Sequence, residues 1–282
     1  MLKFGADILV FNSVNFFSRN GDNLLIGWYW GAGSLGLYDK AYSLLLMPVQ
    51  QINAPIAAVA VPALARCQSK LDELKQYYLS MYRVIASLSI PVIFAVALFA
   101  PEIVLLWLGP KWAECAELFR LLAPAALIGA LLNPSGWLLI ALGKTRRYRN
   151  LGIAGSILAV VSFVLGLPYG THGVALAYSI QSVVLFVPIW GVVLRGTGIE
   201  LRVFLANIWH PVASSVVAAL SAGATKVLLP AAMSDLLVAV LGGTVFGLVY
   251  AIVLLVFFEE IGLLNKIVRE LRAPTKKPKG QG

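Results

Sequence analysis

A row of polar side chains runs along an apolar segment near the start of the sequence. Its members are Asn12, Asn15, Arg19, Asp22 and Asn23. At 100° per residue they fall within about 100° of one helix face. A guanidinium pairs with phosphate or carboxylate, whereas amides hydrogen-bond to hydroxyl-rich ligands such as sugars. The row therefore predicts a polar surface suited to a phosphate-linked carbohydrate, unless Arg19 and Asp22, three residues apart, simply neutralise each other.

A second, weaker row follows in the next apolar segment. The residues that share a sector of about 80° are Asp39, Ser43, Gln50 and Asn53, with Lys40 and Gln51 at its edge. Prolines recur every seven residues in the same segment, at positions 48, 55 and 62. Proline removes a backbone hydrogen bond, so these residues predict either a helix that bends or a fixed packing seam.

The composition indicates which elements position these rows. Of 282 residues, 60% are hydrophobic and 12% are charged, and the mean hydropathy is +0.85. A soluble chain needs a far more polar shell around its core. These values exclude a soluble enzyme, a coiled coil, a disordered chain and a disulfide scaffold.

The apolar residues suffice for about eight membrane-spanning helices of roughly 20 residues each. In hydrocarbon every backbone group must be paired within the segment, so long apolar stretches without strand alternation are helices. We expect an all-α, polytopic integral membrane helix bundle. Its helices are predicted at residues 5–29, 37–61, 77–99, 119–142, 151–168, 174–194, 204–228 and 236–258.

Basic residues alternate between the two sides of this predicted bundle. Sixteen fall on one side, in the connections near residues 3, 66–75, 144–149 and 195–202 and after residue 265, against Lys111 and Lys226 on the other. Cytoplasmic loops hold the excess of Lys and Arg. We therefore expect a multi-pass membrane protein with both termini in the cytoplasm. The formal charge of +9 is explained by this topology, so no nucleic-acid partner is expected.

Catalytic, metal and cofactor motifs are not found in the sequence. Cys67 and Cys115 lie far apart, and two histidines, His172 and His210, are too few for a His-rich site. There is no Gly-rich phosphate loop, GxSxG elbow or HExxH motif. We expect no catalytic residue, no metal site and no cofactor, and therefore a protein that is not an enzyme.

Four stretches of the sequence carry a family resemblance. They are SRNGDNLLIG at 18–27, LGLYDKAYSLLLMPVQQI at 35–52, PALARCQ at 62–68 and LLNPSGWLLIALGKTRR at 131–147. The chain resembles the oligosaccharide flippases and polysaccharide exporters of the multidrug/oligosaccharidyl-lipid/polysaccharide superfamily, especially the O-antigen flippase and colanic acid exporter group. The resemblance weakens after about residue 202. Trp28 departs from it, because the family commonly has Arg at that position.

The resemblance implies an architecture. Family members have twelve to fourteen helices in two lobes of six, and the SRNxDNLLIG helix opens the second lobe. The chain is thus expected to be equivalent to the second half of a two-lobed flippase, with an N-terminal lobe as a missing partner. Its expected parts are a six-helix lobe at 1–202, two trailing helices at 203–258, and a cytoplasmic amphipathic segment with a disordered basic tail at 259–282.

The resemblance also implies a function. Family members move a polyprenyl-pyrophosphate-linked oligosaccharide, embedded in the membrane lipid, across the inner membrane by alternating access between the two lobes. Coupling of this transport to an ion is proposed for several members. On this basis Arg19 and Lys40 are expected to contact the substrate pyrophosphate, and Asp22 to orient Arg19. The full set of expected substrate-binding residues is Asn12, Asn15, Arg19, Asp22, Asn23, Asp39, Lys40, Gln50 and Asn53.

Two other functions stay open at this point. A cation-coupled multidrug exporter would need intramembrane carboxylates, and Asp7, Asp22 and Asp39 are candidates. A truncated, non-transporting remnant or scaffold that binds a partner subunit is the second alternative.

Overall fold

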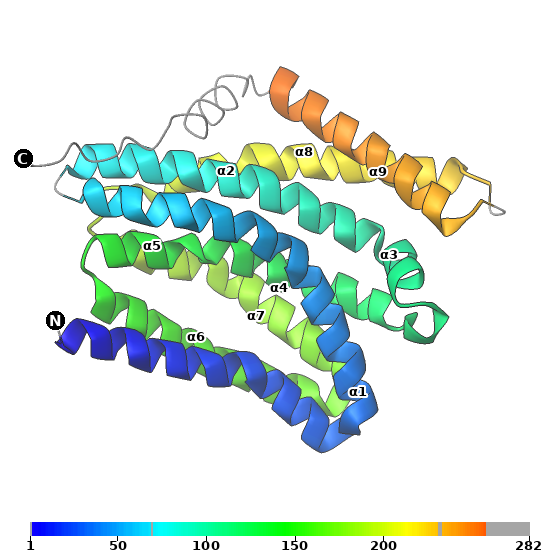
Figure 1. Ribbon diagram of the computed structural model, residues 1–282, viewed down its shortest axis with the longest axis horizontal. Coiled ribbons are helices and arrows are strands. Elements are labelled where there is room, and N and C mark those ends of the chain that lie inside the picture. Colours follow the sequence, from blue (N-terminus) through cyan, green and yellow to red (C-terminus); the bar gives the residue numbers. More distant parts are fainter. Residues whose placement is uncertain (1, 69, 231–232, 258–282) are drawn as a thin grey trace, which may run out of the picture.

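The structure is a computed structural model that describes residues 2–68, 70–230 and 233–257, with side chains from residue 20 to residue 256. These residues form helices and contain no strand, which confirms the all-α expectation (Figure 1). The α-helices are α1 (Leu2–Arg66), α2 (Leu71–Leu98), α3 (Ala100–Trp107), α4 (Cys115–Leu132), α5 (Pro134–Ala141), α6 (Thr145–Gly166), α7 (Gly170–Val193), α8 (Leu201–Leu228) and α9 (Asp235–Ile252). Short turns of other helix types are η1 (Pro110–Trp112), η2 (Leu167–Tyr169) and η3 (Val253–Phe257).

Helix α1 contains the first two predicted spans, joined at a sharp bend. Gly31 interrupts the helical backbone with φ 82° and ψ 177°. A side chain at positive φ costs roughly 1–2 kcal/mol, and glycine avoids that cost. Residues on both sides of Gly31 continue the helix directly, so the loop expected between the two segments is absent. We call residues 2–30 the first arm, Gly31 the elbow and residues 32–66 the second arm.

The second arm changes direction along its length, rising from the elbow and then running beside α2 (Figure 1). It contains Pro48, Pro55 and Pro62 without a break in the helix. Prolines inside a helix are a sufficient cause of such a bend, because each removes one backbone hydrogen bond.

Six helical segments of the described chain are long and apolar enough to cross a membrane. Two of them are bent: Asn20–Arg66 at the elbow, and Thr145–Val193 at η2. The eight predicted segments therefore map onto the four other segments and the two arms of each bent one. The multi-pass membrane architecture is confirmed.

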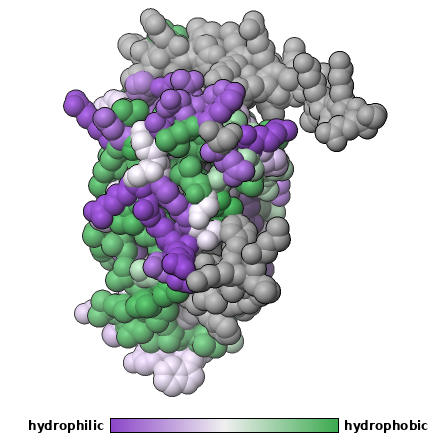
Figure 2. All heavy atoms as spheres, turned by 90° about the vertical axis from the view of Figure 1, so that its left-hand side faces the viewer, coloured by the Kyte–Doolittle hydropathy of each residue, from purple (hydrophilic) through white to green (hydrophobic). Residues whose placement is uncertain are grey.

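The connections gather at two opposite ends of the bundle (Figure 1). One end holds the α1–α2, α5–α6 and α7–α8 connections, which include Lys70, Lys144 and Arg195. Hydrophilic residues collect on this end, here called the basic end (Figure 2). The other end, here called the outer end, holds the elbow, α3, η1, η2 and the α8–α9 connection. The predicted alternation of basic residues is thus present in the described connections.

Two clusters of buried side chains form the centre of the bundle. Near the outer end, Ile26 and Tyr38 of α1 pack with Phe119 of α4 and Phe163 of α6. Near the basic end the core is aromatic: the ring centroids of Trp190 and Phe204 are 4.0 Å apart, and those of Tyr82 and Phe204 are 4.3 Å apart. Both pairs are tilted, and Tyr82 and Trp190 form an edge-to-face pair with centroids 5.3 Å apart. Aromatic contacts of this kind add stability beyond their buried area.

Helix α8 contributes to this aromatic core through Phe204 and Ile208, although it lies beyond the predicted lobe boundary at residue 202. At the outer end Lys226 of α8 forms an ion pair with the buried Glu102 of α3, with 2.5 Å between Nζ and Oε1. The division into a lobe and two trailing helices stays a prediction. The predicted amphipathic segment and basic tail at 259–282 lie outside the described residues.

Candidate functional site

The elbow folds the two arms of α1 against each other and pairs their polar side chains. The hydroxyl of Tyr38 donates a hydrogen bond to Oδ2 of Asp22 at 3.1 Å. One residue further along each arm, Nδ2 of Asn23 donates to Oδ1 of Asp39 at 3.3 Å. Both bonds join residues sixteen apart in the sequence. The two arms thus form a helical hairpin with two polar links close to the elbow.

Asp22 is buried in this hairpin, with 2% of its surface exposed. Its second oxygen, Oδ1, accepts a hydrogen bond from the backbone N–H of Asn23 at 2.8 Å. A buried carboxylate without donors is costly, and the cost is greater at membrane depth. Tyr38 and the Asn23 amide offset that cost, so Asp22 is held as part of the hairpin.

The second arm presents other polar residues outward. Lys40, Ser43, Gln50 and Gln51 are exposed, while Asp39 is half-buried. Charged and amide groups exposed along a membrane-spanning helix face a water-filled cavity or another protein surface, because lipid does not satisfy them. This exposed row is the part of the candidate site that a ligand can reach.

Asn53 differs from its neighbours because it is buried, with 6% of its surface exposed. Its Oδ1 has no hydrogen-bond partner among the described residues. Asn53 therefore lies behind the exposed row formed by Lys40 and Gln50, and the structure does not bring it to the same surface.

The remaining predicted residues are in the first arm. Asn12, Asn15 and Arg19 fall within α1, and their side chains lie outside the described part of the structure. Their roles stay predictions, as does the orienting role of Asp22 toward Arg19. The contacts that the structure gives to Asp22 are those with Tyr38 and Asn23.

Tyr38 is the site residue that the sequence patterns missed. Its ring is fully buried and contacts Tyr42, with 6.2 Å between the centroids. On a helical wheel it lies off the polar sector of the second arm, so periodicity assigns it to the core. Only the position of the elbow shows that residues 22 and 38 face each other.

The elbow is tied to the rest of the bundle. Nε1 of Trp30 donates to the carbonyl of Leu167 in η2 at 2.8 Å, so the two bends of the chain meet at the outer end. The thiol of Cys115, at the start of α4, lies 3.4 Å from the carbonyl of Leu37. These contacts hold the hairpin in place against α4, α6 and α7.

Metal ligands do not gather anywhere in the described chain: it holds no group of three or more His, Cys, Asp or Glu residues that could bind an ion.

The helical hairpin lies in a part of the chain that matches a known protein family. Residues 1–117, which include both arms, match the family described as polysaccharide biosynthesis protein. The resemblance to polysaccharide exporters is confirmed. Among curated relatives, the chain is 30% identical over 142 residues to the teichuronic acid biosynthesis protein TuaB of Bacillus subtilis, a match that covers 50% of this chain and 29% of TuaB.

Two further relatives, whose names also refer to polysaccharide biosynthesis, extend the match. The lipopolysaccharide biosynthesis protein WzxC of Escherichia coli is 24% identical over 212 residues, covering 74% of this chain and 43% of WzxC. The amylovoran biosynthesis protein AmsL of Erwinia amylovora is 28% identical, covering 58% of this chain and 41% of AmsL. The chain spans less than half the length of these curated relatives.

A solved structure shares the fold. The lipid II flippase MurJ, in an inward closed conformation, superposes with a TM-score of 0.71 at 15% sequence identity. The superposition covers 88% of this chain and 52% of MurJ. At this identity the likeness shows that the two chains share a fold, and no more.

Proposed function

We propose that the chain takes part in moving a lipid-linked oligosaccharide or polysaccharide precursor across the inner membrane by alternating access. The observation that carries the proposal is the match of residues 1–117 to a polysaccharide biosynthesis family, because this stretch contains the polar hairpin. The names of TuaB, WzxC and AmsL all refer to polysaccharide biosynthesis, and the MurJ fold supports transport as the mode of action.

The exposed row of the second arm is proposed as one wall of the substrate cavity. Lys40 supplies a cation for the pyrophosphate, and Gln50 supplies an amide for sugar hydroxyls. Arg19 of the first arm is proposed as the second cation. The opposing wall is proposed to come from a second six-helix unit, which agrees with a match that covers about half of MurJ.

Removal of the Arg19 cation tests this proposal. In cells whose surface polysaccharide depends on the protein, we expect Arg19→Ala to abolish polysaccharide export while the variant still accumulates in the membrane fraction. Arg66→Ala is the matched control, because Arg66 is an exposed arginine at the far end of the same helix. Export at the normal level in Arg19→Ala would exclude the proposed pyrophosphate contact.

The basic end is proposed to face the cytoplasm, because cytoplasmic loops hold the excess of Lys and Arg. A membrane-impermeant maleimide tests the orientation in intact cells of a Cys67→Ser background. Tyr169→Cys, at the exposed η2 of the outer end, is expected to react before permeabilisation. Gln68→Cys, exposed at the basic end, is expected to react only afterwards. The reverse pattern would invert the proposed topology.

A further inference from the structure

The α7–α8 connection at the basic end is held by cations from the neighbouring connection. Nζ of Lys144 donates to the carbonyl of Gly196 at 2.6 Å, and the Arg147 guanidinium donates to the carbonyl of Arg195. Since Lys144 before α6 and Arg147 in its first turn both bind this short loop, three basic residues lie within one small area: Lys144, Arg147 and Arg195.

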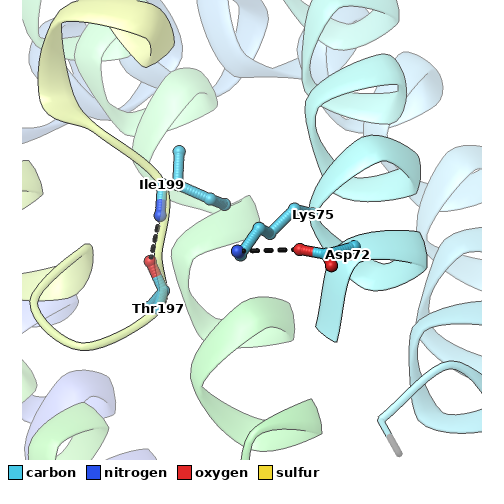
Figure 3. A network of polar contacts seen from close by, with 4 residues as sticks. All are labelled: Asp72, Lys75, Thr197 and Ile199. Atoms are coloured by element: carbon cyan, nitrogen blue, oxygen red, sulfur yellow. Dashed lines mark hydrogen bonds and ion pairs between the residues drawn. The ribbon is translucent and has the colours of Figure 1, made fainter. Parts of the chain in front are cut away.

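The same loop also contacts α2. A Cβ built on Gly198 would lie 2.6 Å from Nζ of Lys75, so the loop and the end of this side chain are in close contact. Gly198 also has φ +74°, a backbone conformation that favours glycine. Figure 3 shows Lys75 paired with Asp72 on α2, near the loop at Thr197, which accepts a hydrogen bond from the Ile199 amide at 3.2 Å. The loop therefore has a fixed backbone on which Arg195 is presented.

The charges at the basic end divide into a compensated part and an uncompensated part. At the start of α2, Lys70 pairs with Glu73 at 2.8 Å and Lys75 pairs with Asp72 at 3.0 Å. By contrast, Glu200 is the one carboxylate between residues 142 and 202, a stretch with six Lys or Arg residues. In the described chain no ion pair joins Lys144, Arg146, Arg147 or Arg195 to a carboxylate.

The four uncompensated cations repel one another. Arg146 and Arg147 lie in the first turn of α6, where the helix dipole already places partial positive charge, and that turn has no acidic residue. Burial and the nearby Arg147 both lower the pKa of Lys144, as expected in a positive field. A bound anion would offset the repulsion.

We propose that Lys144, Arg146, Arg147 and Arg195 bind the phosphate of an anionic phospholipid headgroup. Lipid is favoured over free phosphate by the position of the cluster, at the ends of the membrane-spanning α6 and α7. Both helices continue from it with exposed apolar side chains such as Ile157 and Val187, which suit acyl chains. This inference is independent of the proposed transport function.

Lipid titration of the purified full-length chain tests the site. Phosphatidylglycerol is titrated into detergent-solubilised protein, with phosphatidylcholine and inorganic phosphate in parallel, and native mass spectrometry counts the bound lipids. The test variant is Arg146→Gln/Arg195→Gln, because neither side chain has a hydrogen bond in the described structure that its loss would break. Lys70→Gln is the matched control, with a charge removed from the compensated part of the same end.

We expect the wild-type chain and Lys70→Gln to retain phosphatidylglycerol in preference to phosphatidylcholine. Each cation near an anionic headgroup is worth about fivefold in affinity, so the double variant should bind phosphatidylglycerol about 25-fold more weakly. Equal retention in all three proteins would overturn the proposal. Displacement of the lipid by millimolar inorganic phosphate would also overturn it, because the site would then be one for soluble anions.

Discussion

Asp22 is a carboxylate that the chain buries beside an elbow instead of exposing it to a cavity. Its oxygens receive one donor from across the hairpin, Tyr38, and one from its own helix. The buried and exposed polar residues of the two rows therefore have different tasks. Asp22 stabilises the hairpin, whereas Lys40 and Gln50 stay accessible.

Tyr38→Phe removes the donor from the second arm and leaves Oδ2 of Asp22 buried without a partner. The loss is expected to lower the free energy of unfolding by about 1–2 kcal/mol. An SDS titration measures this as a shift in the mole fraction of SDS at which half of the protein is unfolded. Tyr169→Phe, which alters an exposed tyrosine, is the control and should leave the midpoint unchanged. A Tyr38→Phe midpoint equal to that of the control would mean that the hydroxyl bond contributes nothing.

Sequence patterns reach only part of this arrangement. They place Asp22 on the polar face of its helix, because that depends on helical period alone. They do not pair it with Tyr38, because that pairing depends on the backbone of Gly31. The sequence patterns also group Asn53 with Gln50. In the structure Asn53 is buried, whereas Gln50 is exposed.

At the scale of elements, the elbow decides how the two arms meet. The apolar stretches are long enough to be predicted as spans, and each predicted segment coincides with one candidate span or with one arm of a bent span. The continuous helix through residues 32–36 could not be predicted, since Gly33, Ser34 and Gly36 are typical of a loop. Packing against η2 and α4 overrides that local preference.

Gly31→Ala places a Cβ at φ 82° and is expected to cost roughly 1–2 kcal/mol or to shift the elbow. Gly33→Ala is the matched control, because Gly33 is helical and has open space around its Cβ position. Alanine favours helix there by up to about 1 kcal/mol, so its melting temperature should be unchanged or higher. If both variants melt at the same temperature, the elbow does not require glycine.

At the scale of the whole molecule, helix α8 is attached at both ends of the bundle. The ion pair between Glu102 and Lys226 joins it to α3 at the outer end. The aromatic core joins it to α2 and α7 at the basic end. The side chain of Glu102 is 7% exposed; its Oε1 contacts Lys226, and its Oε2 has no hydrogen-bond partner among the described residues. Helix α8 is thus fixed to the bundle at both ends. No feature of the sequence pairs Glu102 with Lys226, because more than a hundred residues separate them.

Lys226→Ala leaves Glu102 buried and unpaired, and should destabilise the protein by on the order of 3 kcal/mol. Glu102→Gln/Lys226→Ala should recover much of that loss, because no charge is then buried. Lys111→Ala, an exposed lysine of the same end, serves as the control in the same SDS titration. A double variant no more stable than Lys226→Ala would show that the buried charge is not the cause.

The hairpin of α1 also bears on how the protein enters the membrane. Asp22 and Asp39, like Arg19 and Lys40 of the same helix, are groups that hydrocarbon would reject if each arm were inserted alone. Both find hydrogen-bond donors within α1 itself, through Tyr38 and Asn23. The two arms can therefore leave the translocon together, as one insertion unit in which the carboxylates of Asp22 and Asp39 are already satisfied, before α4, α6 and α7 have been synthesised.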